Sequence, residues 1–148
     1  MNIKCLTINT HGLRNREKRS NVLLWVKDLN ADVVFLQETH LLQEDKSSLL
    51  KEWDGPLFIS PGETHSAGVV TLFSKRLNFN LISNCSDLSG RYINTIVEID
   101  EKRLQFSNIY APNQVTNRQS FFDNLSSIIK GGIPTILGGE FNSIEDLF

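Results

Sequence analysis

Four apolar segments of this 148-residue chain end in side chains that could hold a metal ion or a phosphate. Ligand sites of α/β proteins collect beyond strand ends, because the loops there converge over a rigid sheet. Hard cations such as Mg²⁺ and Mn²⁺ bind best to carboxylate and amide oxygens, and a metal held in this way can bind a phosphate. Taken singly, each residue is more often a solvated loop acid, a helix cap or a packing tyrosine. Together they indicate metal-dependent phosphate chemistry. They are Asn9, Glu38, Tyr110, Glu140 and Asn142.

The last of these segments, 133–137, is followed by Gly-Gly-Glu-Phe-Asn at 138–142. Two glycines would let the backbone turn sharply and approach a phosphate closely. Glu140 and Asn142 are two residues apart, so they would lie on the same side of an extended segment and reach one site.

One basic cluster follows Asn9 in the sequence. Its charges fit either a solvated helix start or a contact with a nucleic-acid backbone, which would make binding depend on salt. The cluster consists of Arg14, Arg16, Lys18 and Arg19.

The elements that must position these residues form a mixed α/β pattern with much antiparallel pairing. Apolar runs predict strands over 3–9, 33–36, 57–60, 69–74, 77–83, 92–99, 104–110 and 133–137. Apolar periodicity predicts helices over 17–29, 45–53 and 117–130. The expected core includes Val22, Trp25, Val26, Phe35, Leu125 and Ile129.

The composition is that of an ordinary globular domain, with 40% apolar and 22% charged residues and a net charge of −2. This charge forces no polyanionic partner, so any nucleic-acid contact would be a local patch. No apolar run is long enough to span a membrane, and the N-terminus lacks the layout of a signal peptide. Cys5 and Cys85 form no CxxC pair. We therefore expect reduced thiols in an intracellular protein.

Six short motifs occur in the order of one known superfamily. They are NTHGL (9–13), LQETH (36–40), SAGVV (66–70), GRYI (90–93), NIYAPN (108–113) and GGEFN (138–142). Together they resemble the endonuclease/exonuclease/phosphatase superfamily, over nearly the whole chain. Within it, the chain most resembles the endonuclease domain of LINE-type retrotransposons, which is kin to exonuclease III and the abasic-site endonucleases.

The resemblance implies a four-layer α/β sandwich, with two mainly antiparallel sheets face to face and helices outside. It implies that Glu38 and Asn9 hold Mg²⁺ or Mn²⁺, and that Tyr110 contacts the scissile phosphate. Asn142 would orient the phosphate and the attacking water. Glu140 stands where the family has an aspartate that positions the nucleophile or assists the leaving group.

The chain departs from the family pattern at Glu140 and at its end, which comes before the family's C-terminal motifs. The missing motifs would supply further strands of the second sheet, another aspartate and an Asp-His pair. We therefore expect a single domain over 1–148 that lacks its C-terminal part. The sheet edge after Leu137 would be exposed and would favour self-association. The chain alone should be a poor or inactive nuclease.

The function that follows is Mg²⁺-dependent hydrolysis of phosphodiester bonds in DNA, most naturally in the nucleus. One alternative is a truncated remnant of a retrotransposon endonuclease that no longer catalyses. Another is a phosphatase of the same superfamily that acts on a small or lipid phosphoester. The motifs at 10–13, 36–40 and 110–113 favour DNA. Nothing in the sequence points to an obligate protein partner.

Overall fold

Eight strands and three α-helices lie within residues 1–143, the part of the chain that this computed structural model describes. The strands are β1 (Cys5–Asn9), β2 (Val33–Gln37), β3 (Leu57–Ser60), β4 (Val69–Phe73), β5 (Asn80–Ser86), β6 (Tyr92–Ile99), β7 (Lys102–Tyr110) and β8 (Thr135–Glu140). The helices are α1 (Arg16–Asp28), α2 (Lys46–Glu52) and α3 (Val115–Ile128), with a 3-10 turn, η1 (Gln43–Asp45), before α2.

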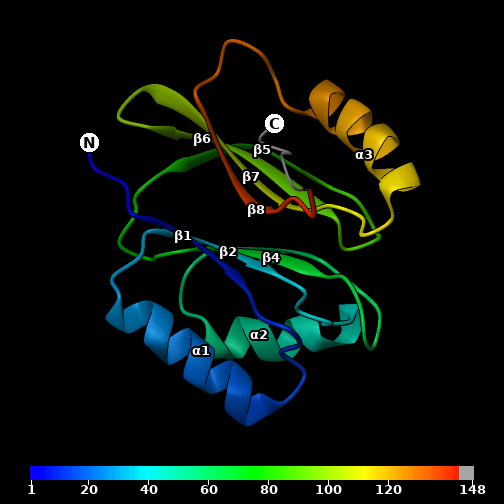
Figure 1. Ribbon diagram of the computed structural model, residues 1–148. Coiled ribbons are helices and arrows are strands. Elements are labelled where there is room, and N and C mark those ends of the chain that lie inside the picture. Colours follow the sequence, from blue (N-terminus) through cyan, green and yellow to red (C-terminus); the bar gives the residue numbers. More distant parts are fainter. Residues whose placement is uncertain (144–148) are drawn as a thin grey trace, which may run out of the picture.

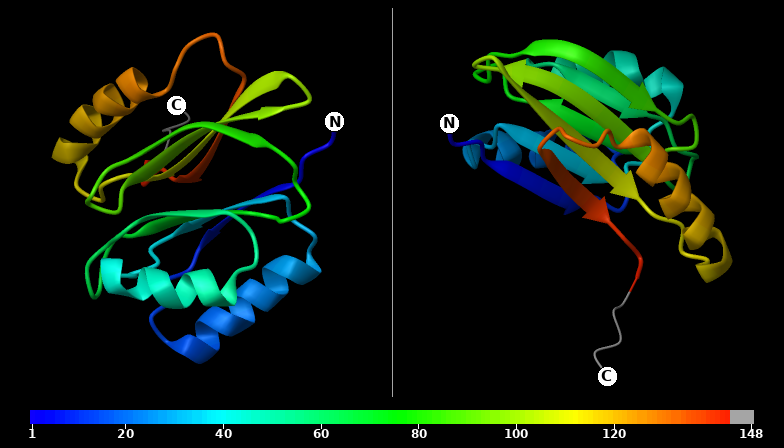
Figure 2. Two further views of the ribbon diagram at one scale, coloured as in Figure 1. Left: turned by 180° about the vertical axis from the view of Figure 1, so that it is seen from behind. Right: turned by 90° about the horizontal axis from the view of Figure 1, so that it is seen from above.

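The strands form two four-stranded sheets, ordered β1-β2-β4-β3 and β5-β6-β7-β8. Each sheet has one parallel pair, β1 with β2 and β7 with β8, and its other pairs are antiparallel. The sheets stack face to face, with α1 and α2 outside the first sheet and α3 outside the second (Figures 1 and 2). The predicted four-layer sandwich is confirmed.

Strand β2 is covered on both faces, which explains its unbroken apolar sequence. Val34 and Leu36 belong to the core under α1 and α2, whereas Val33 and Phe35 belong to the core between the sheets. Phe73 and Phe106 meet edge to face across the sheets, with ring centroids 5.7 Å apart. This packing fixes β2 as a rigid support for Glu38, the residue after it.

A buried polar network joins the two sheets next to that support. The Gln37 amide nitrogen donates to Asn108 Oδ1 at 2.9 Å, and Asn108 Nδ2 donates to the Val70 carbonyl at 2.9 Å. Both side chains are almost fully buried. Because buried amides without partners are costly, these bonds fix the register of one sheet against the other.

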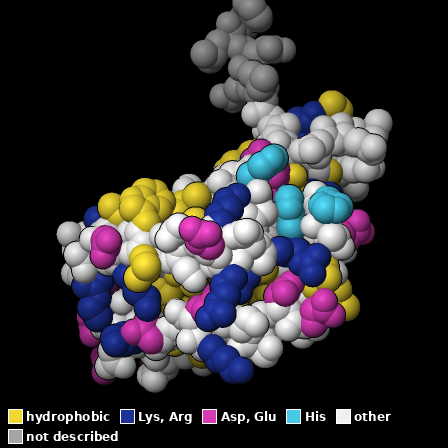
Figure 3. Space-filling view, turned by 90° about the horizontal axis from the view of Figure 1, so that it is seen from below, with side chains coloured by type: hydrophobic (Ala, Val, Ile, Leu, Met, Phe, Trp, Pro, Cys, Tyr) yellow, Lys and Arg dark blue, Asp and Glu magenta, His cyan; other side chains and the backbone are white. Residues whose placement is uncertain are grey.

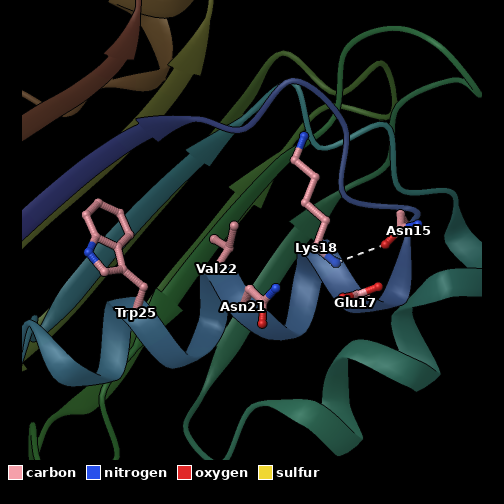
Figure 4. A pocket seen from close by; sticks show the side chains of 6 residues that line it. All are labelled: Asn15, Glu17, Lys18, Asn21, Val22 and Trp25. Carbon is pink, nitrogen blue, oxygen red and sulfur yellow. Dashed lines mark hydrogen bonds between the residues drawn. The ribbon is translucent and has the colours of Figure 1, made fainter.

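Helix α1 buries a different face from the predicted one. Its buried residues are Arg19, Leu23 and Val26, and Trp25 is 50% exposed. Trp25 projects from α1 beside Val22, along a hollow of about 670 Å³ (Figure 4). The prediction that Trp25 belongs to the core is wrong, because the apolar pattern could not count an arginine as buried. Val26, Phe35 and Leu125 are buried as predicted, and Val22 and Ile129 are partly buried.

The bounds of the remaining helices and strands agree with those predicted from the sequence to within a few residues. The strand predicted over 77–83 lies at Asn80–Ser86, with a bulge between Leu81 and Ser83. The hairpin between β6 and β7 turns through Asp100 and Glu101, which have φ of 49° and 61°. Within 1–143, none of the helices combines the length and apolar character that crossing a bilayer needs.

Candidate active site

Backbone hydrogen bonds extend the first sheet beyond its strands and place Glu38. Thr10 N–H donates to the Gln37 carbonyl at 2.9 Å, and Gly12 N–H donates to the Glu38 carbonyl at 2.7 Å. Glu38 has φ of 49°, in the left-handed region that few non-glycine residues adopt. Such conformations cluster at functional sites, where the surrounding structure holds them in place.

Strand β8 brings Glu140 to the same place from the second sheet. It pairs in parallel with β7, with Glu140 opposite Tyr110, and Ala111 N–H donates to the Glu140 carbonyl at 2.8 Å. The two glycines before Glu140 serve close packing. A Cβ on Gly138 would lie 2.4 Å from the Phe35 ring, and one on Gly139 would lie 2.0 Å from the Ile109 carbonyl oxygen. These contacts explain the glycines without any approach to a phosphate.

The Glu38 carboxylate is the centre of the cluster. Tyr110 OH donates to its Oε1 at 2.9 Å, and His11 Nδ1 lies 3.2 Å from its Oε2. Burial alone would raise the pKa of Glu38, but hydrogen bonds from Tyr110, Asn9 and His11 outweigh it and hold the pKa below its usual value. Glu38 is therefore a charged carboxylate at neutral pH.

Asn9 links the two acids across the sheets. Its side-chain nitrogen donates to Glu140 Oε2, and its Oδ1 accepts a hydrogen bond from His11 N–H at 3.0 Å. Burial, and then the nearby charge of Glu38, raise the pKa of Glu140. The charge of Glu38 disfavours a charge on Glu140, and a bound cation would relieve this repulsion.

Tyr110 is set up as a hydrogen-bond donor. Burial and the bond to Glu38 raise the pKa of Tyr110 to about 12. The Arg91 guanidinium lies over its ring, 4.9 Å from the centroid. The phenol thus stays protonated at neutral pH and can donate to an anion.

Asn142 lies beside this cluster without a hydrogen bond to its acids. Strand β8 ends at Glu140, and Asn142 has φ of 48°. Its side-chain nitrogen donates to the Ala111 carbonyl at 2.7 Å, and Arg118 donates to its backbone carbonyl. The expectation of one extended segment carrying both groups is therefore wrong. The structure brings together Asn9, Glu38, Tyr110 and Glu140, and attaches Asn142 to the residue after Tyr110.

The donor set fits a hard divalent cation. Among residues 1–143, no three His, Cys, Asp or Glu side chains gather closely enough to hold a metal by themselves. Here two carboxylates, Glu38 and Glu140, face each other around the Asn9 amide. Oxygen donors of this kind suit Mg²⁺ or Mn²⁺, which keep several waters and need few protein ligands.

The basic cluster divides into one structural residue and three surface residues. Arg19 is buried, and its guanidinium forms two bonds with the Glu52 carboxylate, at 2.6 and 2.9 Å. The prediction that Arg19 contacts nucleic acid is wrong, because its charge is already paired inside the protein. Arg14, Arg16 and Lys18 are exposed at the start of α1.

Sequence reasoning missed the histidines around Glu38. His40 Nε2 lies 4.0 Å from Glu38 Oε2, and its pKa is lowered by burial, against the opposing effect of the Glu38 charge. His11 and His40 both lie within motifs that were read for other residues. The sequence feature that could have identified them is their spacing, since His11 lies two residues after Asn9 and His40 lies two residues after Glu38.

Fold and site together define a two-sheet α/β sandwich with a carboxylate–amide–phenol cluster at one end of its sheets. The sequence matches the Endonuclease/Exonuclease/phosphatase family over residues 6–147, and the chain belongs to this family. It is 34% identical, over 149 residues, to the Transposon TX1 uncharacterized 149 kDa protein of Xenopus laevis. That match covers 99% of this chain and 11% of the Xenopus protein.

Solved structures share the fold at low sequence identity. A humanized TDP2 of D. rerio has a TM-score of 0.71 at 18% identity, over 97% of this chain and 67% of that one. The endonuclease domain of TRAS1, a telomere-specific non-LTR retrotransposon, has a TM-score of 0.70 at 14% identity. That match covers 96% of this chain and 61% of the TRAS1 domain. The AP endonuclease LMAP of Leishmania major has a TM-score of 0.67 at 20% identity. That match covers 91% of this chain and 53% of LMAP. The chain thus spans between half and two thirds of these structures.

Proposed function

We propose that this chain carries the metal-binding part of an Mg²⁺-dependent endonuclease that cleaves phosphodiester bonds in DNA, of the retrotransposon type. The observation that carries the proposal is the Glu38 carboxylate, held by Tyr110 and His11 and facing Glu140 across Asn9. Similarity to a transposon protein and to a retrotransposon endonuclease domain supports DNA as the substrate. Because such a substrate is nuclear DNA, we also propose the nucleus as the place where the protein acts.

The resemblance to the family supports a role for each of these residues. Glu38 and Asn9 would hold Mg²⁺, which when bound neutralises charge on the phosphate and lowers the pKa of a bound water. Tyr110, whose single O–H donates to Glu38 in this structure, would turn it to the scissile phosphate once a cation takes that carboxylate. Glu140, with its raised pKa, positions the attacking water or assists the leaving group. Asn142 orients the phosphate from the loop after β8.

A plasmid-nicking assay tests this function. Supercoiled plasmid is incubated with the purified chain and Mg²⁺, with Glu38→Gln as the matched blank, since an amide keeps the shape and loses the charge. We expect slow nicking that needs Mg²⁺ and disappears in the variant. Slow turnover is expected because Glu140 is one methylene longer than aspartate, and a misplacement of about 1 Å can cost on the order of a hundredfold in rate. Equal nicking by both proteins would contradict the proposal, and no nicking by either would favour the remnant without catalysis.

The two alternatives make different predictions in the same assay. A remnant without catalysis would bind DNA or nothing and would not nick with Mg²⁺ or Mn²⁺. A phosphatase of small or lipid phosphoesters would release phosphate from such substrates and leave plasmid intact. The match to a transposon protein over 99% of the chain favours the nuclease.

We also propose that the chain self-associates through the edge of the second sheet. Among residues 1–143, β8 is the outermost strand of its sheet, and Leu137 on it is 42% exposed. Phe141, just beyond it, is 37% exposed. Unpaired strand edges with apolar side chains recruit other chains. Light scattering after size exclusion should show dimers or larger species that Leu137→Lys reduces, and a monomer at all concentrations would refute this.

A further inference from the structure

A buried glutamine fixes the C-terminal end of α3 on the outer face of the second sheet (Figure 1). Gln105 Oε1 accepts a hydrogen bond from Lys130 N–H at 3.0 Å, and Gln105 Nε2 donates to the Lys130 carbonyl at 3.2 Å. Leu125 is the buried residue of the helix itself. Because a buried amide without partners is costly, these bonds set the place of α3 on the sheet. The helix is therefore a fixed support for the side chains at its other end.

Arg118 extends from the first turn of α3 to the loop after β8. Its guanidinium donates a hydrogen bond to the Asn142 carbonyl. Its Nε is buried, and among residues 1–143 this atom has no hydrogen-bond partner. A buried N–H without a partner costs free energy. The guanidinium therefore stays in this position against a penalty, and the bond to Asn142 is a contact that holds it there.

Asn142 is held both at its backbone and at its side chain. Arg118 binds its carbonyl, and its side-chain nitrogen donates to the Ala111 carbonyl at 2.7 Å. Its φ of 48° lies in the left-handed region, which is less favourable than extended backbone for a residue with a side chain. A hydrogen bond from a charged donor can keep a residue in such a conformation. Without that bond, the loop would be free to relax and the Asn142 side chain would leave Ala111.

The loop that Arg118 holds lies at the end of the sheets that carries the candidate site. Ala111 follows Tyr110 directly, and its N–H donates to the Glu140 carbonyl at 2.8 Å. Figure 3 shows an acidic side chain against the histidines on this face of the molecule. The contact between α3 and the loop therefore decides whether the Asn142 amide stays at Ala111, next to Tyr110.

We propose that Arg118 is a positioning residue of the active site. Its bond to the Asn142 carbonyl fixes the loop after β8 in the conformation that presents the Asn142 amide next to Tyr110. This role rests on the proposed function, because that amide would orient the phosphate of the same substrate. In this role Arg118 touches neither the metal nor the phosphate and acts through Asn142. The sequence motifs give no sign of it, since Arg118 lies 24 residues before Asn142 and on another element.

The test follows the Asn142 side-chain amide by NMR in the isotope-labelled chain, without metal or DNA. The variant Asn142→Asp lacks this signal and so identifies it. Arg118→Met removes the donor and keeps an apolar stem, and Arg118→Ala removes it with the residue type that favours helices most. Arg103→Met is the matched control, because Arg103 is exposed at the far end of β7 from Tyr110.

Exchange of the Asn142 amide protons with water should be about tenfold faster in both Arg118 variants than in wild type and Arg103→Met. A hydrogen bond from a charged donor stabilises the closed state by at least about this factor. In the nicking assay, Arg118→Met should lower kcat about tenfold and leave KM within about twofold of that of Arg103→Met. Thermal unfolding shows whether each variant keeps the fold, and Arg118→Ala decides if Arg118→Met does not.

The outcomes separate this role from the chemistry. Faster exchange in the Arg118 variants, with no nicking by wild type, supports the positioning role and counts against the proposed reaction. Equal exchange in all four proteins refutes the positioning role whatever the nicking result. A higher KM with unchanged kcat in Arg118→Met also refutes it, because Arg118 would then bind DNA itself.

Discussion

Replacing Gly138 with alanine should destabilise the protein, because the new methyl group would press on the Phe35 ring. The ideal Cβ position lies 2.4 Å from Phe35 Cδ2 and 2.9 Å from Cε2. Phe35 is 2% exposed and packs between the sheets, so its ring has little room to move. Overpacking of this kind costs about 1–3 kcal/mol. For a domain of this size, each kcal/mol lowers Tm by about 2–4 °C.

Gly131→Ala is the matched control, since nothing lies within 4 Å of a Cβ at that position. Its stability should change by less than about 0.5 kcal/mol. Thermal and urea unfolding, followed by circular dichroism, measure both variants. Replacing Phe35 with leucine in the Gly138→Ala background should recover part of the loss. If Gly138→Ala unfolded at the same temperature as Gly131→Ala and instead lost DNA binding, the glycine would serve the phosphate and our packing explanation would be wrong.

Three further changes test other parts of the account. Trp25→Ala should lower the free energy of unfolding, measured in urea, by about 1 kcal/mol, because half of the side chain is already in water. Trp53→Ala, at a site that is 5% exposed, should lower it by about 3–5 kcal/mol. Equal losses for the two variants would contradict the assigned buried face of α1. The hydrogen bond from Arg19 lowers the pKa of the Glu52 carboxyl below its usual 4.5 in the folded state, so this pair stabilises the fold above that pH and the benefit is lost as pH falls through the folded-state pKa. The Tm gap between wild type and Glu52→Gln should therefore close between pH 5 and acid, and a gap independent of pH would refute the pairing. Glu140→Asp should raise the nicking rate, by up to about a hundredfold, and a slower variant would show that the longer side chain is the adapted one.

The fold could be predicted because its strands are short apolar runs and its motifs occur in family order. The buried face of α1 could not be predicted, because it depends on Glu52. This residue is 33 residues from Arg19 in the sequence and is brought to it by α2. Local periodicity treats Trp25 as apolar and Arg19 as polar, so it predicts that Trp25 is buried and Arg19 exposed. The long-range ion pair between Arg19 and Glu52 reverses both predictions.

The positions of the candidate site residues could be predicted where a side chain ends a strand, but not where the conformation of a loop sets them. Glu38 and Tyr110 follow from their strands, since the sheets bring their ends together. The positive φ of Asn142, which turns its amide toward Ala111, is not encoded in the pattern of apolar residues. The same holds for His11, whose contact with Glu38 exists because backbone bonds join the two loops.

Calorimetric titration with Mg²⁺ and Mn²⁺ tests the central claim most directly, because it measures the metal at Glu38 apart from any turnover. Glu101→Gln is the control, since Glu101 lies exposed in the hairpin turn at the other end of β7 from Tyr110. We expect wild type and Glu101→Gln to bind one ion alike, and Glu38→Gln to bind it at least tenfold more weakly, a difference of about 1.4 kcal/mol. Equal affinity in all three proteins would show that Glu38 is not the metal ligand and would contradict the account.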